Sequence, residues 1–276
     1  MDGDLQRDEL QLATGPQDPR RGAAVISIGK DDRHEKRRLY RYIAREPAAS
    51  SDTKTLEVIL MIGLLDFDGK IPNLALMKIS TYYKSQGIPV ELVKPGRKYE
   101  KVYCSVLFSW NREKAARLQV IYPDIEFGGT GYDISKTLPP EIEACQPDYD
   151  LYTVDDILPR IRGGIATKAS KIRKAEEIIN AGIGFTSRGC VRSCGFCVVP
   201  KKEGRLHHVA EIRDLLNSRS NVLILLDNNI TADPDCIEKL HEIRDRGLVT
   251  DITQGIDVRL MTPEIAKALS EGFNTL

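Results

Sequence analysis

The stretch Thr186-Ser-Arg-Gly-Cys190-Val-Arg-Ser-Cys194-Gly-Phe-Cys197-Val-Val-Pro200 carries three cysteines in a CxxxCxxC spacing. Thiolates are soft metal ligands, and closely spaced cysteines can turn their sulfurs toward one centre where glycines, here Gly189 and Gly195, permit sharp turns. A structural zinc site takes four ligands, whereas this loop supplies three. The sequence therefore favours an iron–sulfur cluster with one iron left open. The predicted metal ligands are Cys190, Cys194 and Cys197.

Two histidines follow the loop and supply the alternative. His207 and His208 are the nearest side chains that could complete a zinc site from outside the cysteine run. A histidine in a loop is also a common surface residue, and three free thiols without any metal are the plainest interpretation. These alternatives stay open beside the iron–sulfur prediction.

Composition limits the general class of protein. The 276 residues contain 40 Lys plus Arg and 40 Asp plus Glu, so no overall charge attracts nucleic acid or a membrane, and any charge argument must be local. Six cysteines, three of them scattered, do not form the dense framework of a small secreted domain. The longest apolar run, from Val58 to Leu65, is too short to span a membrane, and the N-terminus resembles no signal peptide. We expect a cytoplasmic protein with no membrane partner.

The apolar pattern predicts two α/β parts. Residues 1–54 are poor in large apolar side chains and are expected to form a disordered tail. Residues 55–158 alternate apolar runs with helix-like segments, which is typical of a doubly wound, flavodoxin-like parallel sheet. The predicted strands are Val58–Ile62, Pro89–Val93, Lys101–Phe108, Ile125–Gly129 and Tyr149–Val154. The predicted helices are one between Pro72 and Gly87 and one over Arg112–Leu118.

A basic linker and helix over 159–182 join this part to the next. The linker contains Arg160, Arg162, Lys168, Lys171, Arg173 and Lys174. A solvated segment and a phosphate or RNA contact both fit this charge, although no aromatic side chains are interleaved for stacking.

Residues 183–276 predict three further βα units beside the cysteine loop. The elements are a helix over Val209–Asn217, a strand over Val222–Leu226, a helix from Asp233-Pro234 through Arg246, a strand region over Ile252–Leu260 and a helix from Thr262-Pro263 to Gly272.

Polar residues follow several of the predicted strands. Parallel α/β sheets bind ligands at the carboxyl ends of their strands. The turns Asp66-Phe-Asp-Gly69 and Gly128-Gly-Thr-Gly131 lie at such ends in the first part, and Asp227-Asn-Asn229 lies at one in the second. Ligand binding and ordinary turn chemistry are both open for each of them.

The cysteine loop, with the aromatic Phe196 before its last cysteine, resembles that of the radical S-adenosylmethionine superfamily. The resemblance implies a [4Fe-4S] cluster on the three cysteines and S-adenosylmethionine on the open iron. It also implies one-electron cleavage of that cofactor, with an electron donor such as flavodoxin or ferredoxin. The family's barrel has six βα units, so the three units here imply an incomplete barrel, with the substrate unknown.

The same resemblance assigns further positions. Asp227-Asn228-Asn229 occupies the place of the family's methionyl-binding motif, in a form that departs from the commoner glycine-glycine-glutamate, and Asp257 and Arg259 lie at the end of the next strand. An ion pair between Asp257 and Arg259 is the alternative. The predicted cofactor-binding residues are Phe196, Asp227, Asn228, Asn229, Gln254, Asp257 and Arg259. No catalytic residue is predicted.

The first α/β part resembles the cobalamin-binding-type domain that often precedes this barrel. Because there is no histidine between Leu56 and Asp156 to ligate cobalt, we expect a scaffold or substrate-binding lobe without cobalamin. Cys197-Val-Val-Pro200 followed by Gly204-Arg205 is also similar to the methylthiotransferases of transfer RNA. The remaining alternative is a non-enzymatic α/β binding module in which the metal only stabilises the fold.

Overall fold

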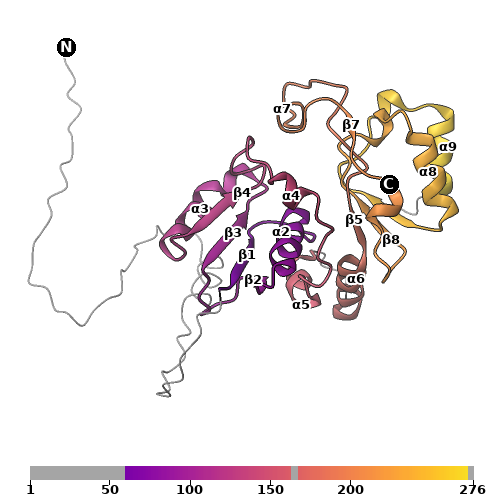
Figure 1. Ribbon diagram of the computed structural model, residues 1–276. Coiled ribbons are helices and arrows are strands. Elements are labelled where there is room, and N and C mark those ends of the chain that lie inside the picture. The colour runs from indigo at the N-terminus through magenta and orange to yellow at the C-terminus, as the bar shows by residue number, and fades with distance from the viewer. Residues whose placement is uncertain (1–59, 163–166, 273–276) are drawn as a thin grey trace, which may run out of the picture. The chain divides into compact units, whose positions relative to one another are not determined.

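The computed structural model describes residues 60–162 and 167–272 (Figure 1). The expected tail, residues 1–54, lies outside these ranges. The described residues form a mixed α/β structure with two parallel sheets, which confirms the predicted fold class at that level. Among the helices of this part of the chain, none is both long enough and apolar enough to cross a membrane.

The first sheet has four parallel strands in the order β2-β1-β3-β4. Their bounds are β1 (Ile62–Asp66), β2 (Val90–Leu92), β3 (Lys101–Ser105) and β4 (Ile125–Gly128). Adjacent positions point to opposite faces, so Leu64 and its register partner Tyr103 pack in one apolar cluster while Leu65 and its partner Cys104 pack in another. The sheet is therefore covered on both faces, as its apolar strands require.

Helix α2 (Leu74–Ser85) covers the Leu64 face, and the opposite cluster includes Ala115 of α3 (Arg112–Ala116). Helix α2 begins where the Asn73 side chain accepts a hydrogen bond from the Leu76 N–H, and Gly87, at φ 75°, follows its end. The helix predicted between Pro72 and Gly87 is confirmed.

The second sheet has three parallel strands in the order β5-β8-β9. Its strands are β5 (Gly182–Gly184), β8 (Val222–Leu225) and β9 (Val249–Ile252). The helices α8 (Cys236–Asp245) and α9 (Pro263–Gly272) pack against its apolar side chains, Leu223 and Leu225 among them. Helix α6 (Lys168–Asn180) leads into β5. The other helices are α4 (Pro140–Glu143), α5 (Val154–Ile157) and α7 (Val199–Lys202).

Besides the strand predicted over Lys101–Phe108, which ends at Ser105, four predicted elements differ from the structure. The strand predicted over Val58–Ile62 is described over Ile62–Asp66, where its residues pair in register with Lys101–Ser105 of β3, and residues 58 and 59 lie outside the described ranges. Tyr149–Val154 forms no strand. Its side chains Leu151 and Tyr152 are buried in the core, and a capping box between Thr153 and Asp156 starts α5 there.

The other two differences lie in the second part. The helix predicted over Val209–Asn217 is one 3-10 turn, η4 (Ile212–Leu215), and the backbone is extended at Leu216. The strand predicted over Ile252–Leu260 is wrong in its bounds: β9 runs over Val249–Ile252, and a turn containing Gly255, at φ 81°, follows it. Strand β5 has no counterpart among the predicted elements.

Candidate metal and cofactor site

The cysteine loop is closed at its base by two short strands. Strand β6 (Ser187–Arg188) pairs antiparallel with β7 (His207–His208), with Ser187 opposite His208 and Arg188 opposite His207. The two ends of the loop formed by residues 189–206 therefore lie next to each other, and the loop contains Cys190, Cys194, Cys197 and helix α7 (Figure 1).

Cys190, Cys194 and Cys197 are free and partly exposed. The backbone holds the ends of the cysteine run: the Cys190 N–H donates to the Gly204 carbonyl at 3.3 Å, and the Cys197 N–H donates to the Cys194 carbonyl at 3.0 Å. Within residues 60–162 and 167–272, no three His, Cys, Asp or Glu side chains are placed together to hold a metal ion. The loop thus brings the three thiols into one segment without converging their sulfurs on a shared point.

The two glycines of the loop differ in what they contribute. Gly189 has φ 84°, and a Cβ there would collide with the Arg205 carbonyl, so a side chain is excluded on both counts. Gly195 has an ordinary φ, and nothing lies within 4 Å of the position of its Cβ. The predicted need for a glycine is confirmed at Gly189, whereas the structure shows no such need at Gly195.

Asp227 anchors the start of the loop. It is 0% exposed, and its carboxylate accepts four hydrogen bonds from two successive residues. The donors are the Thr186 N–H (2.7 Å), the Thr186 hydroxyl (2.5 Å), the Ser187 N–H (2.9 Å) and the Ser187 hydroxyl (2.9 Å). The acid at the end of β8 thus fixes the chain just before β6, and the cofactor contact that we expect for it stays a prediction.

The two asparagines after Asp227 also face the loop. The Asn228 side-chain oxygen accepts the Gly189 N–H at 2.9 Å. The Asn229 amide donates to the Cys190 sulfur at 3.4 Å, and its oxygen accepts the Thr231 hydroxyl at 2.9 Å. The polar triplet therefore lies at the carboxyl end of β8, as predicted, and contacts the backbone and first cysteine of the loop.

The residues after β9 add a third group of contacts. Arg259 forms an ion pair with Asp257, with Nε and Oδ1 2.7 Å apart, and Asp257 and then the nearby Cys194 side chain raise the pKa of Arg259. The Arg192 Nε lies 2.6 Å from the other Asp257 oxygen. Hydrogen bonds from Arg259 and then Arg192 hold the pKa of Asp257 well below its usual range. Arg192 lies within the cysteine run, but no pattern in the sequence predicts its contact with Asp257.

Two predicted cofactor residues are exposed. The Phe196 side chain is 95% exposed, and Gln254 lies on the surface of the turn after β9. A phenyl ring with this exposure contributes nothing to a packed core, so its cofactor contact stays a prediction.

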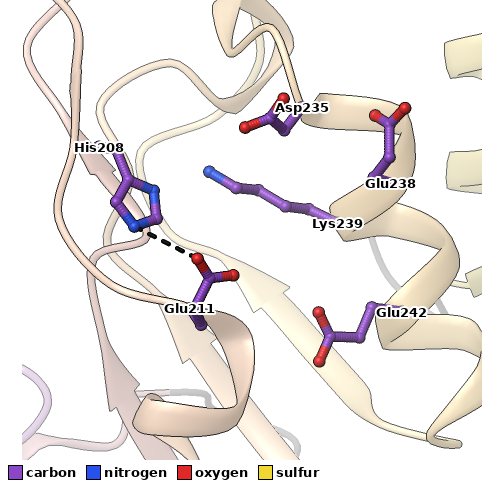
Figure 2. Close-up of a pocket in the computed structure, with 6 residues that line it drawn as sticks. All are labelled: His208, Glu211, Asp235, Glu238, Lys239 and Glu242. Atoms are coloured by element: carbon purple, nitrogen blue, oxygen red, sulfur yellow. Dashed lines mark ion pairs between the residues drawn. The ribbon is translucent and has the colours of Figure 1, made fainter.

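His207 and His208 border two hollows rather than the cysteines. One, of about 350 Å³, is lined by His208 with Glu211, Asp235, Glu238, Lys239 and Glu242, and Figure 2 shows these side chains around it. His208 Nε2 lies 3.5 Å from Glu211, and Lys239 is paired with Asp233 at 2.6 Å. The other, of about 430 Å³, extends between Val191 and Pro234. Neither hollow has a cysteine in its wall, and among residues 60–162 and 167–272 no histidine is grouped with the cysteines.

The acidic turn of the first sheet is occupied by structural contacts. The Asp66 side chain is 1% exposed and accepts hydrogen bonds from Arg160 (2.5 Å) and the Tyr152 hydroxyl (3.0 Å). Asp68 accepts the N–H groups of Leu107 (2.7 Å) and Phe108 (3.1 Å). The structure favours turn chemistry over ligand binding here, and it also shows that Arg160 of the basic stretch serves the fold.

The glycine turn after β4 is shaped by close packing. Gly129 has φ 90°, and a Cβ on Gly131 would collide with the Phe108 backbone. The Gly131 N–H donates to the Val106 carbonyl at 2.9 Å. Gly129 and Gly131 are thus accounted for by backbone geometry and by packing against residues 106–108, whereas nothing lies within 4 Å of a Cβ at Gly128.

Comparison with known proteins identifies a similar fold. A structure of the radical S-adenosylmethionine methyltransferase TsrM from Kitasatospora setae, with cobalamin and a [4Fe-4S] cluster bound, matches 78% of this chain at TM-score 0.50 and 14% sequence identity. This chain spans 59% of that protein's length. A second structure of TsrM, with tryptophan substrate and the analogue aza-SAM bound, covers 78% of this chain and 57% of its own, at TM-score 0.48 and 14% identity. At such identity the likeness concerns the fold alone.

Neither the protein-family models nor the curated proteins provide a match to this sequence. The evidence for function therefore lies in the residues of the site.

Proposed function

We propose that this chain is a radical S-adenosylmethionine protein that holds a [4Fe-4S] cluster on Cys190, Cys194 and Cys197. The observation that carries the proposal is the loop itself. Its three thiols are free and partly exposed, and Asp227 and Asn228 secure its start at the carboxyl end of β8. Parallel α/β enzymes place their chemistry at this edge.

The donor set fits the proposed group. Three cysteine ligands would leave one coordination position of a [4Fe-4S] cluster for a cofactor, and the loop would have to bring their partly exposed sulfurs together on binding. When bound and reduced, such a cluster supplies one electron that splits S-adenosylmethionine into methionine and a 5′-deoxyadenosyl radical. In this protein we expect that electron to come from a flavodoxin or ferredoxin.

The chain's own residues would bind and orient the cofactor. Asn229 donates to the Cys190 sulfur, and the Arg259–Asp257 pair is joined to Arg192 of the same loop, which supports a role for these residues beside the cysteines. We propose that the polar groups after β8 and β9 line the cofactor site. Those residues are Asp227, Asn228, Asn229, Gln254, Asp257 and Arg259, with Phe196 as the aromatic neighbour.

We propose that the four-stranded part acts as a scaffold or substrate-binding lobe without cobalamin. Its acids Asp66 and Asp68 are engaged in hydrogen bonds within the fold. We further propose that residues 183–276 form part of a radical S-adenosylmethionine barrel, with about three βα units. The substrate is unknown, and a contact of the basic stretch with nucleic acid is a weaker part of the proposal. This chain spans 59% of the comparison enzyme.

Anaerobic reconstitution with iron and sulfide tests the proposal. We expect the full chain to take up about four irons and about four sulfides with charge-transfer absorption, and Cys194→Ala to lose them. Cys145→Ala is the matched control, since Cys145 is also partly exposed but lies outside the loop. Reduced protein should then convert S-adenosylmethionine to 5′-deoxyadenosine. Stoichiometric bound zinc without sulfide would refute the proposal and favour the non-enzymatic module with a structural metal.

A further inference from the structure

The Asp257 carboxylate joins two arginines from separate segments. Arg192 belongs to the cysteine loop, between Cys190 and Cys194, while Arg259 lies in the 3-10 turn η6 (Val258–Leu260) after β9. Arg192 Nε donates to Oδ2 at 2.6 Å, Arg259 Nε donates to Oδ1 at 2.7 Å, and Arg259 Nη2 donates to Oδ2 at 3.1 Å. Both oxygens are thus used in charge-assisted hydrogen bonds, which are among the stronger ones.

Asp257 itself is held firmly. Its side chain is 8% exposed, and its backbone N–H donates to the Thr231 hydroxyl oxygen at 3.1 Å. Thr231 is buried, and its hydroxyl donates to the Asn229 oxygen, while the Asn229 amide contacts the Cys190 sulfur. Asp257 is therefore connected to Cys190 from two sides, through Arg192 in the loop and through Thr231 and Asn229.

The charges of the group matter for the cysteines. Two guanidinium groups and one carboxylate leave one net positive charge beside the cysteine loop. Without Asp257, both arginines would lose this ion-pair partner, and the link from Arg192 of the loop to the turn after β9 would be lost. The carboxylate thus influences both the position of the loop and the electrostatic potential around it.

We propose that Asp257 is a positioning residue that holds the cysteine loop to the turn after β9 through Arg192, a link termed the clasp, and that it keeps the Arg259 charge beside the loop. The clasp of the loop is a property of the chain alone. Its effect on a cluster rests on the proposed function, so the two are tested separately.

The first experiment measures amide hydrogen exchange in the metal-free full chain. In Asp257→Asn, amides of residues 189–206 should exchange roughly tenfold faster or more, since a charged hydrogen bond that closes the loop is lost, while β8 amides keep their rates. Asp257→Glu should restore much of the protection. The control is Asp251→Asn, which removes an exposed carboxylate from β9 itself. Unchanged exchange over 189–206 in Asp257→Asn would overturn the proposal.

A double-mutant cycle assigns the effect to the pair. Arg192→Gln should accelerate exchange over the same residues, and the double variant Arg192→Gln with Asp257→Asn should be little faster than either single variant. Fully multiplicative effects of the two substitutions would show that the residues act independently and would refute the clasp.

The second experiment measures the cluster's reduction potential. Asp257→Asn removes a negative charge near the cysteines and should raise the potential, whereas Arg259→Gln removes a positive charge and should lower it. A purely structural role would not give shifts of opposite sign, and shifts of equal sign would contradict the electrostatic part. If no cluster assembles in the unaltered protein, the proposed function fails while the exchange experiment still decides the clasp.

Discussion

The Asp227 carboxylate, at the end of β8, accepts the backbone N–H of Thr186 at 2.7 Å, just after the end of β5. Because β5 and β8 are paired neighbours, this bond joins two strands at their shared carboxyl edge. The cysteine loop starts from that point, so the position of its first residues is set by a side chain from another part of the chain.

Removing the Asp227 carboxylate should destabilise the protein strongly. Asp227→Ala would leave four buried donors on Thr186 and Ser187 without an acceptor, at a cost of roughly 2–5 kcal/mol in the free energy of unfolding. Urea denaturation measures this. Asp251→Ala, which truncates an exposed acid on β9, should cost about 0.5 kcal/mol or less. Equal losses in both variants would contradict the anchoring role.

The two loop glycines should respond differently to alanine. Gly189→Ala forces a side chain into a left-handed backbone conformation and against the Arg205 carbonyl, so we expect at least about 1 kcal/mol of destabilisation and poor iron incorporation. Gly195→Ala meets no neighbouring atom and should be nearly neutral in both measurements. Equal iron content in the two variants would show that the turn at Gly189 is dispensable.

The buried ion pair of the first sheet should also be sensitive to mutation. The Asp66 side chain is 1% exposed, and Arg160→Met would leave it without its cationic partner. We expect the free energy of unfolding to fall by about 3–5 kcal/mol. Arg162→Met, two residues along the same basic stretch and exposed, should change stability by about 0.5 kcal/mol or less. Thermal denaturation of the two variants distinguishes a structural arginine from one available to an anionic partner.

Alkaline pH should weaken the second core through Cys236. Burial raises the pKa of this thiol from 9.0 to about 11, so the folded protein retains a proton that the unfolded chain loses. The resulting stability is complete below pH 9 and is lost as the pH rises toward 11. When the pH is raised from about 8 to about 10.5, the free energy of unfolding of Cys236→Ala should fall by roughly 2 kcal/mol less than that of the unaltered protein. Denaturation of Cys145→Ala over the same range serves as the control and should follow the unaltered protein.

The sequence predicted the elements whose apolar residues face a core. The run Val222–Leu226 became β8, and the spacing of Leu76 and Ile79 gave α2. The carboxyl-end position of the Asp227 triplet followed directly from the first of these. Such elements are predictable because their periodicity reflects burial.

The elements that were missed depend on contacts between distant segments. Strand β5 contains Gly182 and Gly184, which show no apolar period, and it exists because Leu215 packs against the space that those glycines leave. Tyr152 is buried as a strand residue would be, yet it lies in an irregular segment, where its hydroxyl donates to the Asp66 carboxylate. The link between Arg192 and Asp257 joins residues 65 positions apart, which no local pattern reveals.

The two-residue pairing of β6 with β7 has a thermodynamic consequence. By holding residues 189 and 206 at neighbouring positions, it removes most of the loop-closure entropy of the segment before any ligand arrives. A metal centre bound by the loop would then need to order only the local backbone between Cys190 and Cys197. Weakening this small pairing should therefore reduce metal affinity even though neither strand contains a cysteine.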